Sequence, residues 1–203
     1  METKTQFDFS TIALDEAYTA FWNRCRGMNV SEKTLTIYNF TAGAFIAWLR
    51  DNGVRFPEEV TERHVSAYLA SVRERKTKTG RMISLNTVHA HARAVRTLLI
   101  YWHEQGYTPN RIKFSMPKLC DTEKNILSQE QLGKILDSAP TARDKAIIAF
   151  MADTGARRQE VCNLNWEHID LKTGAVFIHR GKGNKNRWVG IHPDTRNYLI
   201  AYR

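Results

Sequence analysis

Two short stretches of the sequence hold residues whose types and spacing suit phosphate chemistry. The first, Asp153–Val161, contains Arg157 with Glu160 three residues later, on one face of a helix expected to begin after Gly155. A carboxylate at that spacing can hold a guanidinium through two parallel hydrogen bonds and direct its remaining donors outward. The stretch is therefore a candidate site for an anion.

The second stretch, residues 181–187, is a basic turn between two apolar segments, 175–178 and 188–191, and is predicted to be a β-hairpin. Four cations with no acidic residue between them lie in and beside it: Arg180, Lys182, Lys185 and Arg187. An aimed arginine beside a lysine-bearing turn can grip a phosphate and stabilise charge that develops on it. A plainer interpretation, a helix-capping ion pair beside a solvated turn, fits the same spacing, and both interpretations stay open.

Length and composition limit the classes of protein to which the chain can belong. Its 203 residues suffice for one large domain or two small ones, and the hydrophobic fraction of 42% is that of a globular protein. The formal net charge of +9 favours a polyanionic partner. The N-terminus resembles no signal peptide, and no apolar run approaches a membrane span. We therefore expect a cytoplasmic protein that does not associate with membranes.

The cysteines and histidines predict neither a disulfide framework nor a metal site. Cys25, Cys120 and Cys162 are odd in number and widely scattered. His89 and His91 are two residues apart, so on a helix they point to roughly opposite sides and cannot bind one metal ion. We expect no metal and no other cofactor.

Four amphipathic helices are predicted between residues 12 and 106, because apolar residues recur there at steps of three and four. Ser31, Thr61 and Ser84 are suited to begin the second, third and fourth helices. Helices of similar length joined by short loops are typical of a compact helical bundle.

A strongly basic loop follows the third helix and is a candidate DNA-binding element. It carries five cations against one acid: Arg73, Arg75, Lys76, Lys78 and Arg81. Two further cations, Arg93 and Arg96, lie on the fourth helix away from its apolar stripe. If loop and helix face the same way, they form a strip able to neutralise several phosphates. A merely solvated loop is the alternative.

The rest of the chain is divided by a segment that has no helical period and contains Pro109 and Pro117. We assign 1–11 as a polar lead, 12–106 as a helical domain, 107–125 as a linker and 126–203 as a second domain. In the second domain, helices are expected after Ser128, Thr141 and His192, with the hairpin before the last of them.

Taken together, these features resemble the N-terminal two-thirds of a tyrosine recombinase of the phage-integrase type. The helical domain resembles the core-binding domain of that family, and residues 126–132 resemble the opening of its catalytic domain. Residues 154–166 resemble the segment with the first catalytic arginine, and residues 181–189 resemble the hairpin with the catalytic lysine. The implied fold is mainly α: a four-helix core-binding (SAM-like) domain, followed by part of an α+β catalytic domain with a small antiparallel hairpin or sheet.

The resemblance also implies roles for individual residues in DNA strand cleavage and rejoining. Arg157 would hold the non-bridging oxygens of the scissile phosphate, and Glu160 would orient it. Lys182 would protonate the leaving 5′ oxygen, with Lys185 as the competing candidate, whereas Arg180 and Arg187 would contact the DNA backbone. Implied partners are a double-stranded recombination site and, for a full-length protein, further copies that form a tetrameric synapse.

The sequence also departs from the family pattern. It lacks the second motif, His-x-x-Arg-His, and the late tyrosine nucleophile; Tyr198 and Tyr202 lie in the helix after the hairpin, where the family keeps packing residues. We therefore expect a truncated chain that is inactive by itself, with apolar side chains such as Leu199 and Tyr202 left without partners. Two other functions stay open: a non-catalytic DNA-binding accessory derived from a recombinase, and a helical adaptor for protein partners.

Overall fold

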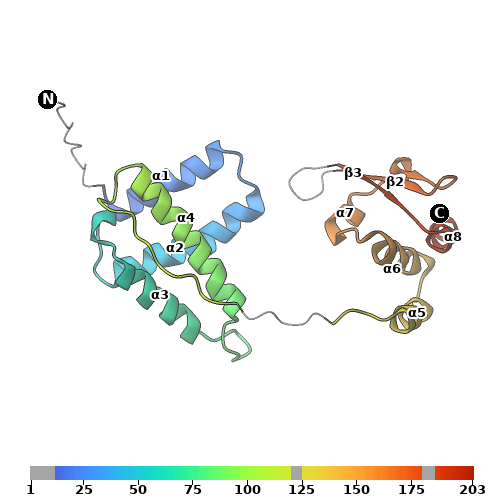
Figure 1. Ribbon diagram of the computed structural model, residues 1–203, viewed down its shortest axis with the longest axis horizontal. Coiled ribbons are helices and arrows are strands. Elements are labelled where there is room, and N and C mark those ends of the chain that lie inside the picture. The colour runs from blue at the N-terminus through green and yellow to red at the C-terminus, as the bar shows by residue number, and fades with distance from the viewer. Residues whose placement is uncertain (1–11, 120–124, 180–185) are drawn as a thin grey trace. The chain divides into compact units, whose positions relative to one another are not determined.

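The computed structural model describes residues 12–119, 125–179 and 186–203, and the chain divides into two compact units, 1–122 and 123–203. The described residues are mainly helical and include a three-stranded antiparallel sheet (Figure 1). The predicted fold class is confirmed.

The first unit contains the four predicted helices. They are α1 (Leu14–Gly27), α2 (Glu32–Asp51), α3 (Glu62–Glu74) and α4 (Leu85–Glu104), with a short 3-10 turn η1 (Pro57–Glu59) before α3. Two of the expected caps form, because Ser31 Oγ accepts a hydrogen bond from the backbone of Thr34 at 3.3 Å and Ser84 Oγ accepts one from Thr87 at 3.2 Å. The helices pack around one apolar core, as the periodicity predicted.

Large aromatic side chains fill the centre of this core. Trp102 is fully buried, and its indole nitrogen donates to the carbonyl of Ala17 at 3.3 Å. The buried hydroxyl of Tyr68 donates to the carbonyl of Thr41 at 3.1 Å and lies 2.7 Å from Nδ1 of His91. Burial raises the pKa of Tyr68 and lowers the pKa of His91, which favours the neutral form of each side chain. His91 is therefore part of the core of the first unit.

The segment after α4, predicted to be a linker, packs against the first unit over much of its described length. Tyr107, Ile112 and Phe114 contact the helical core, and Thr108 is buried. The predicted linker continues through residues 120–124, which lie outside the described part of the chain.

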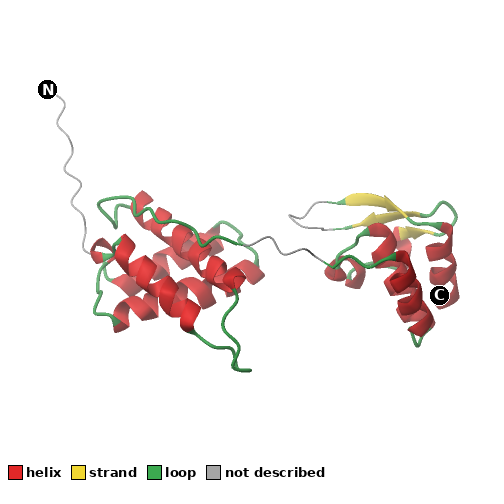
Figure 2. Ribbon diagram, turned by 60° about the horizontal axis from the view of Figure 1, so that its bottom comes forward, coloured by secondary structure: helices red, strands yellow, loops and turns green. Residues whose placement is uncertain are grey.

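The second unit combines short helices with the sheet. Its elements are α5 (Gln129–Ser138), α6 (Ala142–Thr154), α7 (Arg158–Cys162), a 3-10 turn η2 (Trp166–His168), β1 (Ile169–Asp170), β2 (Ala175–Ile178), β3 (Arg187–Gly190) and α8 (Pro193–Tyr202). The strands lie in the order β1-β2-β3, and Phe177 pairs with Trp188. The helices lie on one face of the sheet (Figure 2), where Val176 and Ile178 are buried.

The core of the second unit corrects two sequence-based expectations. Leu199 was expected to lack partners, but it is buried against α6 and the sheet. On α6, the side chain of Ile147 is only half-buried. It lines a groove of about 450 Å³, together with Val161, Trp166 and Tyr202. Tyr202 was also expected to lack partners; it is 42% exposed, but its ring lies 5.6 Å from that of Trp166, centroid to centroid.

Candidate phosphate-binding site

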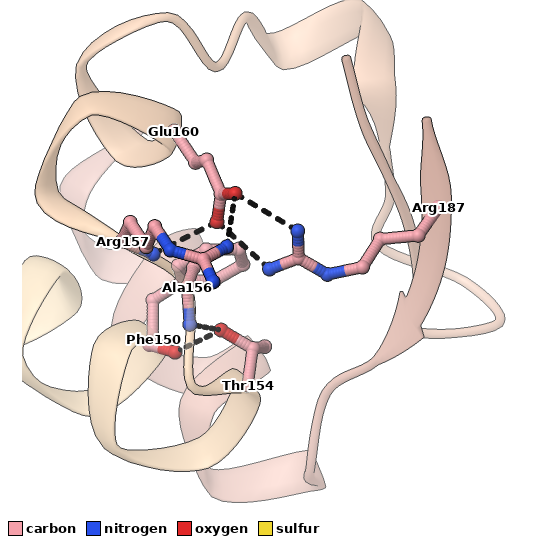
Figure 3. A network of polar contacts seen from close by, with 6 residues as sticks. All are labelled: Phe150, Thr154, Ala156, Arg157, Glu160 and Arg187. Atoms are coloured by element: carbon pink, nitrogen blue, oxygen red, sulfur yellow. Dashed lines mark hydrogen bonds and ion pairs between the residues drawn. The ribbon is translucent and has the colours of Figure 1, made fainter. Parts of the chain in front are cut away.

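A sharp turn at the end of α6 positions the candidate site. The hydroxyl of Thr154 donates to the carbonyl of Phe150 at 2.6 Å and accepts from the backbone N–H of Ala156 at 3.2 Å (Figure 3). Gly155 has a φ of 62°, and its N–H donates to the carbonyl of Met151 at 3.1 Å. Glycine takes this left-handed conformation without a β-carbon clash, so it can end α6 here. Ala156 comes next, and Arg157 follows it as the residue directly before α7.

The spacing predicted that Arg157 lies inside the helix that begins after Gly155. In the structure, Arg157 is instead the N-cap residue of α7. Its backbone N–H donates to Oε2 of Glu160 at 2.8 Å, and its Nη1 donates to Oε1 at 3.0 Å. The expected pairing of Arg157 with Glu160 is therefore present. It uses one guanidinium nitrogen and one backbone nitrogen, whereas two parallel guanidinium bonds had been expected.

The two parallel bonds to Glu160 come from a different residue, Arg187 of β3. Its Nη1 donates to Oε1 of Glu160 at 2.9 Å, and its Nη2 donates to Oε2 at 2.7 Å. Figure 3 shows Arg187 reaching across from the strand to the carboxylate. Arg187 pairs with Ile178, whose side chain is buried, which places it on the helix-covered face of the sheet.

The carboxylate at the centre of this network is buried and ionised. The side chain of Glu160 is 4% exposed, whereas those of Arg187 and Arg157 are 35% and 58% exposed. The hydrogen bonds from Arg187, assisted by those from Arg157, lower the pKa of Glu160 to about 2, against an ordinary value of 4.5. Among the described residues, Arg157 donates to the protein through only one guanidinium nitrogen. Its other donors suit a non-bridging phosphate oxygen.

The lowered pKa of Glu160 predicts acid sensitivity in the second unit. A carboxylate whose pKa is lower in the folded than in the unfolded state stabilises the fold at pH values above its unfolded-state pKa. That stabilisation is lost as the pH falls towards the folded-state pKa. We expect the loss between about pH 4.5 and pH 2. Because solvent screens the partly exposed arginines, we expect only about 1–2 kcal/mol. Urea unfolding across this pH range measures it, and the loss should be absent in Glu160→Gln.

The basic loop of the first unit is ordered by its own hydrogen bonds. Lys76 and Met82 form an antiparallel bridge, and Gly80, with a φ of 78°, lies in the turn between them. Nη1 of Arg73 donates to the carbonyl of Ile83 at 2.6 Å. The loop extends beyond the helix ends (Figure 2). Its five predicted DNA-binding cations are all exposed: Arg73, Arg75, Lys76, Lys78 and Arg81.

The two cations on α4 have different surroundings. Arg93 is exposed. Arg96 is exposed too, but its Nη2 donates to the carbonyl of Phe114 at 3.1 Å and its guanidinium lies 5.4 Å from the ring centroid of Phe114. Arg96 therefore holds the segment after α4 against the helix, a role that sequence reasoning did not assign.

Three predicted site residues, Arg180, Lys182 and Lys185, lie outside the described part of the chain, and their roles stay predictions. Within residues 12–119, 125–179 and 186–203, no cluster of three or more His, Cys, Asp or Glu side chains could hold a metal ion. In the same ranges no helix is both long and apolar enough to cross a membrane.

The chain is similar to known proteins in sequence and in fold. Residues 125–202 match the model of the phage integrase family. The chain is 28% identical to tyrosine recombinase XerC of Oceanobacillus iheyensis over 168 residues, which are 79% of this chain and 53% of the relative. It is 27% identical to tyrosine recombinase XerA of Pyrococcus furiosus over 175 residues, 83% of this chain and 55% of the relative. The chain thus spans about half the length of these curated relatives.

Solved structures with the same fold include two DNA-bound integrases. A lambda integrase dimer bound to a COC′ core site has a TM-score of 0.68 at 14% identity, over 94% of this chain and 54% of that one. The Tn1549 transposon integrase in complex with a circular intermediate DNA has a TM-score of 0.67 at 13% identity, over 94% of this chain and 64% of that one.

Proposed function

Because the chain belongs to the tyrosine recombinase (phage integrase) family, we propose that it binds a double-stranded recombination site and supplies part of a strand-cleaving active site. Both units contact the duplex: the first through its basic loop and α4, the second through the site around Arg157. The protein acts in the cytoplasm without a metal or other cofactor. In a full-length recombinase, further copies join it in a tetrameric synapse.

In this proposal Arg157 and Lys182 act on one scissile phosphate. A tyrosine nucleophile that lies outside this sequence attacks the phosphorus, and charge builds on the equatorial oxygens. Arg157 stabilises that charge with donors fixed before the reaction begins. Lys182 gives a proton to the departing 5′ oxygen, which lowers the barrier to its departure. The same groups serve the reverse step, in which the 5′ hydroxyl of a strand attacks the phosphotyrosine and the strand is rejoined.

The observation that carries the proposal is the way Glu160 holds Arg157. The carboxylate is buried and ionised and is bonded from two sides, whereas the guanidinium of Arg157 is exposed and engaged through one nitrogen. A purely structural ion pair would gain more by engaging both terminal nitrogens of Arg157. The two structural neighbours named above are integrases bound to DNA, which favours duplex DNA as the ligand.

Replacing Arg157 with glutamine is expected to remove one phosphate contact. Fluorescence anisotropy measures binding to a roughly 30-base-pair duplex over roughly 50–300 mM salt. The slope of log K against log salt should be smaller in magnitude for the variant than for the wild type, by about 0.9. Affinity at about 0.1 M salt should fall roughly eightfold.

Lys134→Gln is the matched control, because it removes one cation from the same unit. Lys134 pairs with Glu130 on α5, and its side chain is 73% exposed. This control should retain the wild-type slope. If Arg157→Gln also retained it while neutralisation of Arg73, Arg75 and Lys76 abolished binding, the chain would be a DNA-binding accessory. No binding to duplex DNA would favour the adaptor instead.

A further inference from the structure

The Glu160 carboxylate is shared unequally by two arginines from different elements. Arg187, from β3, gives it both terminal nitrogens, at 2.9 and 2.7 Å. Arg157, at the start of α7, gives it one guanidinium nitrogen at 3.0 Å and its backbone nitrogen at 2.8 Å. Each carboxylate oxygen therefore already accepts from two donors, one from each arginine.

This division decides which arginine can bind a phosphate. Arg187 has both terminal nitrogens engaged, and its side chain is 35% exposed, so a DNA contact through them would first have to break its pair with the buried carboxylate. Within the described part of the chain, Arg157 has one terminal nitrogen engaged, and its side chain is 58% exposed. The arginine that was expected to contact the DNA backbone, Arg187, is thus the less available of the two.

The same division suggests what Arg187 does. A carboxylate prefers two parallel bonds from one guanidinium, and Glu160 lies close enough to Arg157 for such a pair to form. As long as Arg187 occupies both oxygens, Arg157 cannot take that geometry and keeps donors for another ligand. We propose that Arg187 is a positioning residue: by occupying Glu160, it prevents the carboxylate from capturing Arg157 and so keeps that guanidinium available to the DNA phosphate.

This inference rests on the proposed function of Arg157, and it links two parts of the site. Arg187 is the first residue of β3, the strand that comes directly after the lysine-bearing turn in the sequence. The position of β3 therefore also decides how many donors of Arg157 stay available. A displacement of β3 would release Glu160 and let it capture Arg157.

A double-mutant cycle on DNA affinity tests the proposal with the full chain. Arg187→Gln alone should weaken duplex binding roughly eightfold at about 0.1 M salt and reduce the magnitude of the salt slope by about 0.9, the effect of one lost phosphate contact. Arg157→Gln should do the same. The double variant should match Arg157→Gln, because a positioning residue has no effect once its target is gone. A double variant with the summed loss of two contacts would show that Arg187 binds DNA directly and would overturn the proposal.

Arg187→Lys separates positioning from charge, because it keeps the cation and loses the two-nitrogen fork. We expect it to lose most of the affinity that Arg187→Gln loses, and the pKa of Glu160, followed through its carboxyl carbon by NMR, should rise. Wild-type affinity in Arg187→Lys would overturn the proposal, and this variant decides the question if Arg187→Gln fails to fold. An Arg157→Gln variant with unchanged binding would instead refute the proposed function, and this inference with it.

Discussion

Replacing Tyr68 with alanine is expected to lower the free energy of unfolding of the helical unit by about 3–5 kcal/mol. Tyr68 is fully buried, and its ring lies 4.9 Å from that of Phe45 and 5.9 Å from that of Trp48, centroid to centroid. Alanine would leave a cavity where three aromatic rings now meet. It would also leave Nδ1 of His91 without the hydroxyl that now lies 2.7 Å away.

Tyr68→Phe separates the two contributions, because it retains the ring and removes only the hydroxyl. We expect it to lose about 1–3 kcal/mol, the penalty for leaving a buried polar group unsatisfied. Urea unfolding followed by circular dichroism measures both variants. A loss below about 1 kcal/mol in Tyr68→Ala would mean that the core refills the space and that the packing described for α2, α3 and α4 is wrong.

Glu160→Ala is expected to have the largest effect in the second unit. Without the carboxylate, two guanidinium groups that now share one oxygen would face each other unneutralised. Removing one partner of a fully buried ion pair typically destabilises by about 3–5 kcal/mol. Because Arg157 and Arg187 are partly exposed, solvent screens their repulsion, and we expect about 2–3 kcal/mol.

Amide hydrogen exchange of the full chain locates that loss. Protection should fall in α7 and β3, the elements that Glu160 joins, and should stay unchanged in the helical unit. Glu160→Gln is the matched variant: it keeps the shape and one acceptor oxygen, so a smaller loss is expected. Equal protection in Glu160→Ala and the wild type would show that the network does not hold these elements together.

Local signals in the sequence predicted much of the fold. Helix periodicity placed all four helices of the first unit, and the caps at Ser31 and Ser84 form as expected. The pairing of Arg157 with Glu160 was equally accessible, because the two residues lie three apart in one short segment. Interactions inside one helix or turn are fixed by spacing, so they can be read from a single sequence.

Contacts between elements that are distant in the sequence could not be predicted in this way. Arg187 lies 27 residues from Glu160, and nothing in the spacing identifies its partner. One signal existed: residues two apart in a strand share a face, so Arg187 lies on the same side as Val189, which contacts the core. Arg96 and Phe114 are a similar case, because their contact depends on where an irregular segment packs. Leu199 was misjudged for the same reason.

The shared carboxylate also sets the electrical character of the site towards small ions. Two guanidinium groups and one ionised Glu160 sum to a single positive charge, whereas two arginines alone would carry two. A chloride or free phosphate ion therefore meets a site with a net charge of one, partly exposed to water, and the site binds such an ion only weakly. A nucleic acid contacts the protein through many phosphates at once, so weak binding of any single phosphate matters less. Under the proposed function, the acid at the centre of the network thus favours occupation by nucleic acid over the anions of the cell.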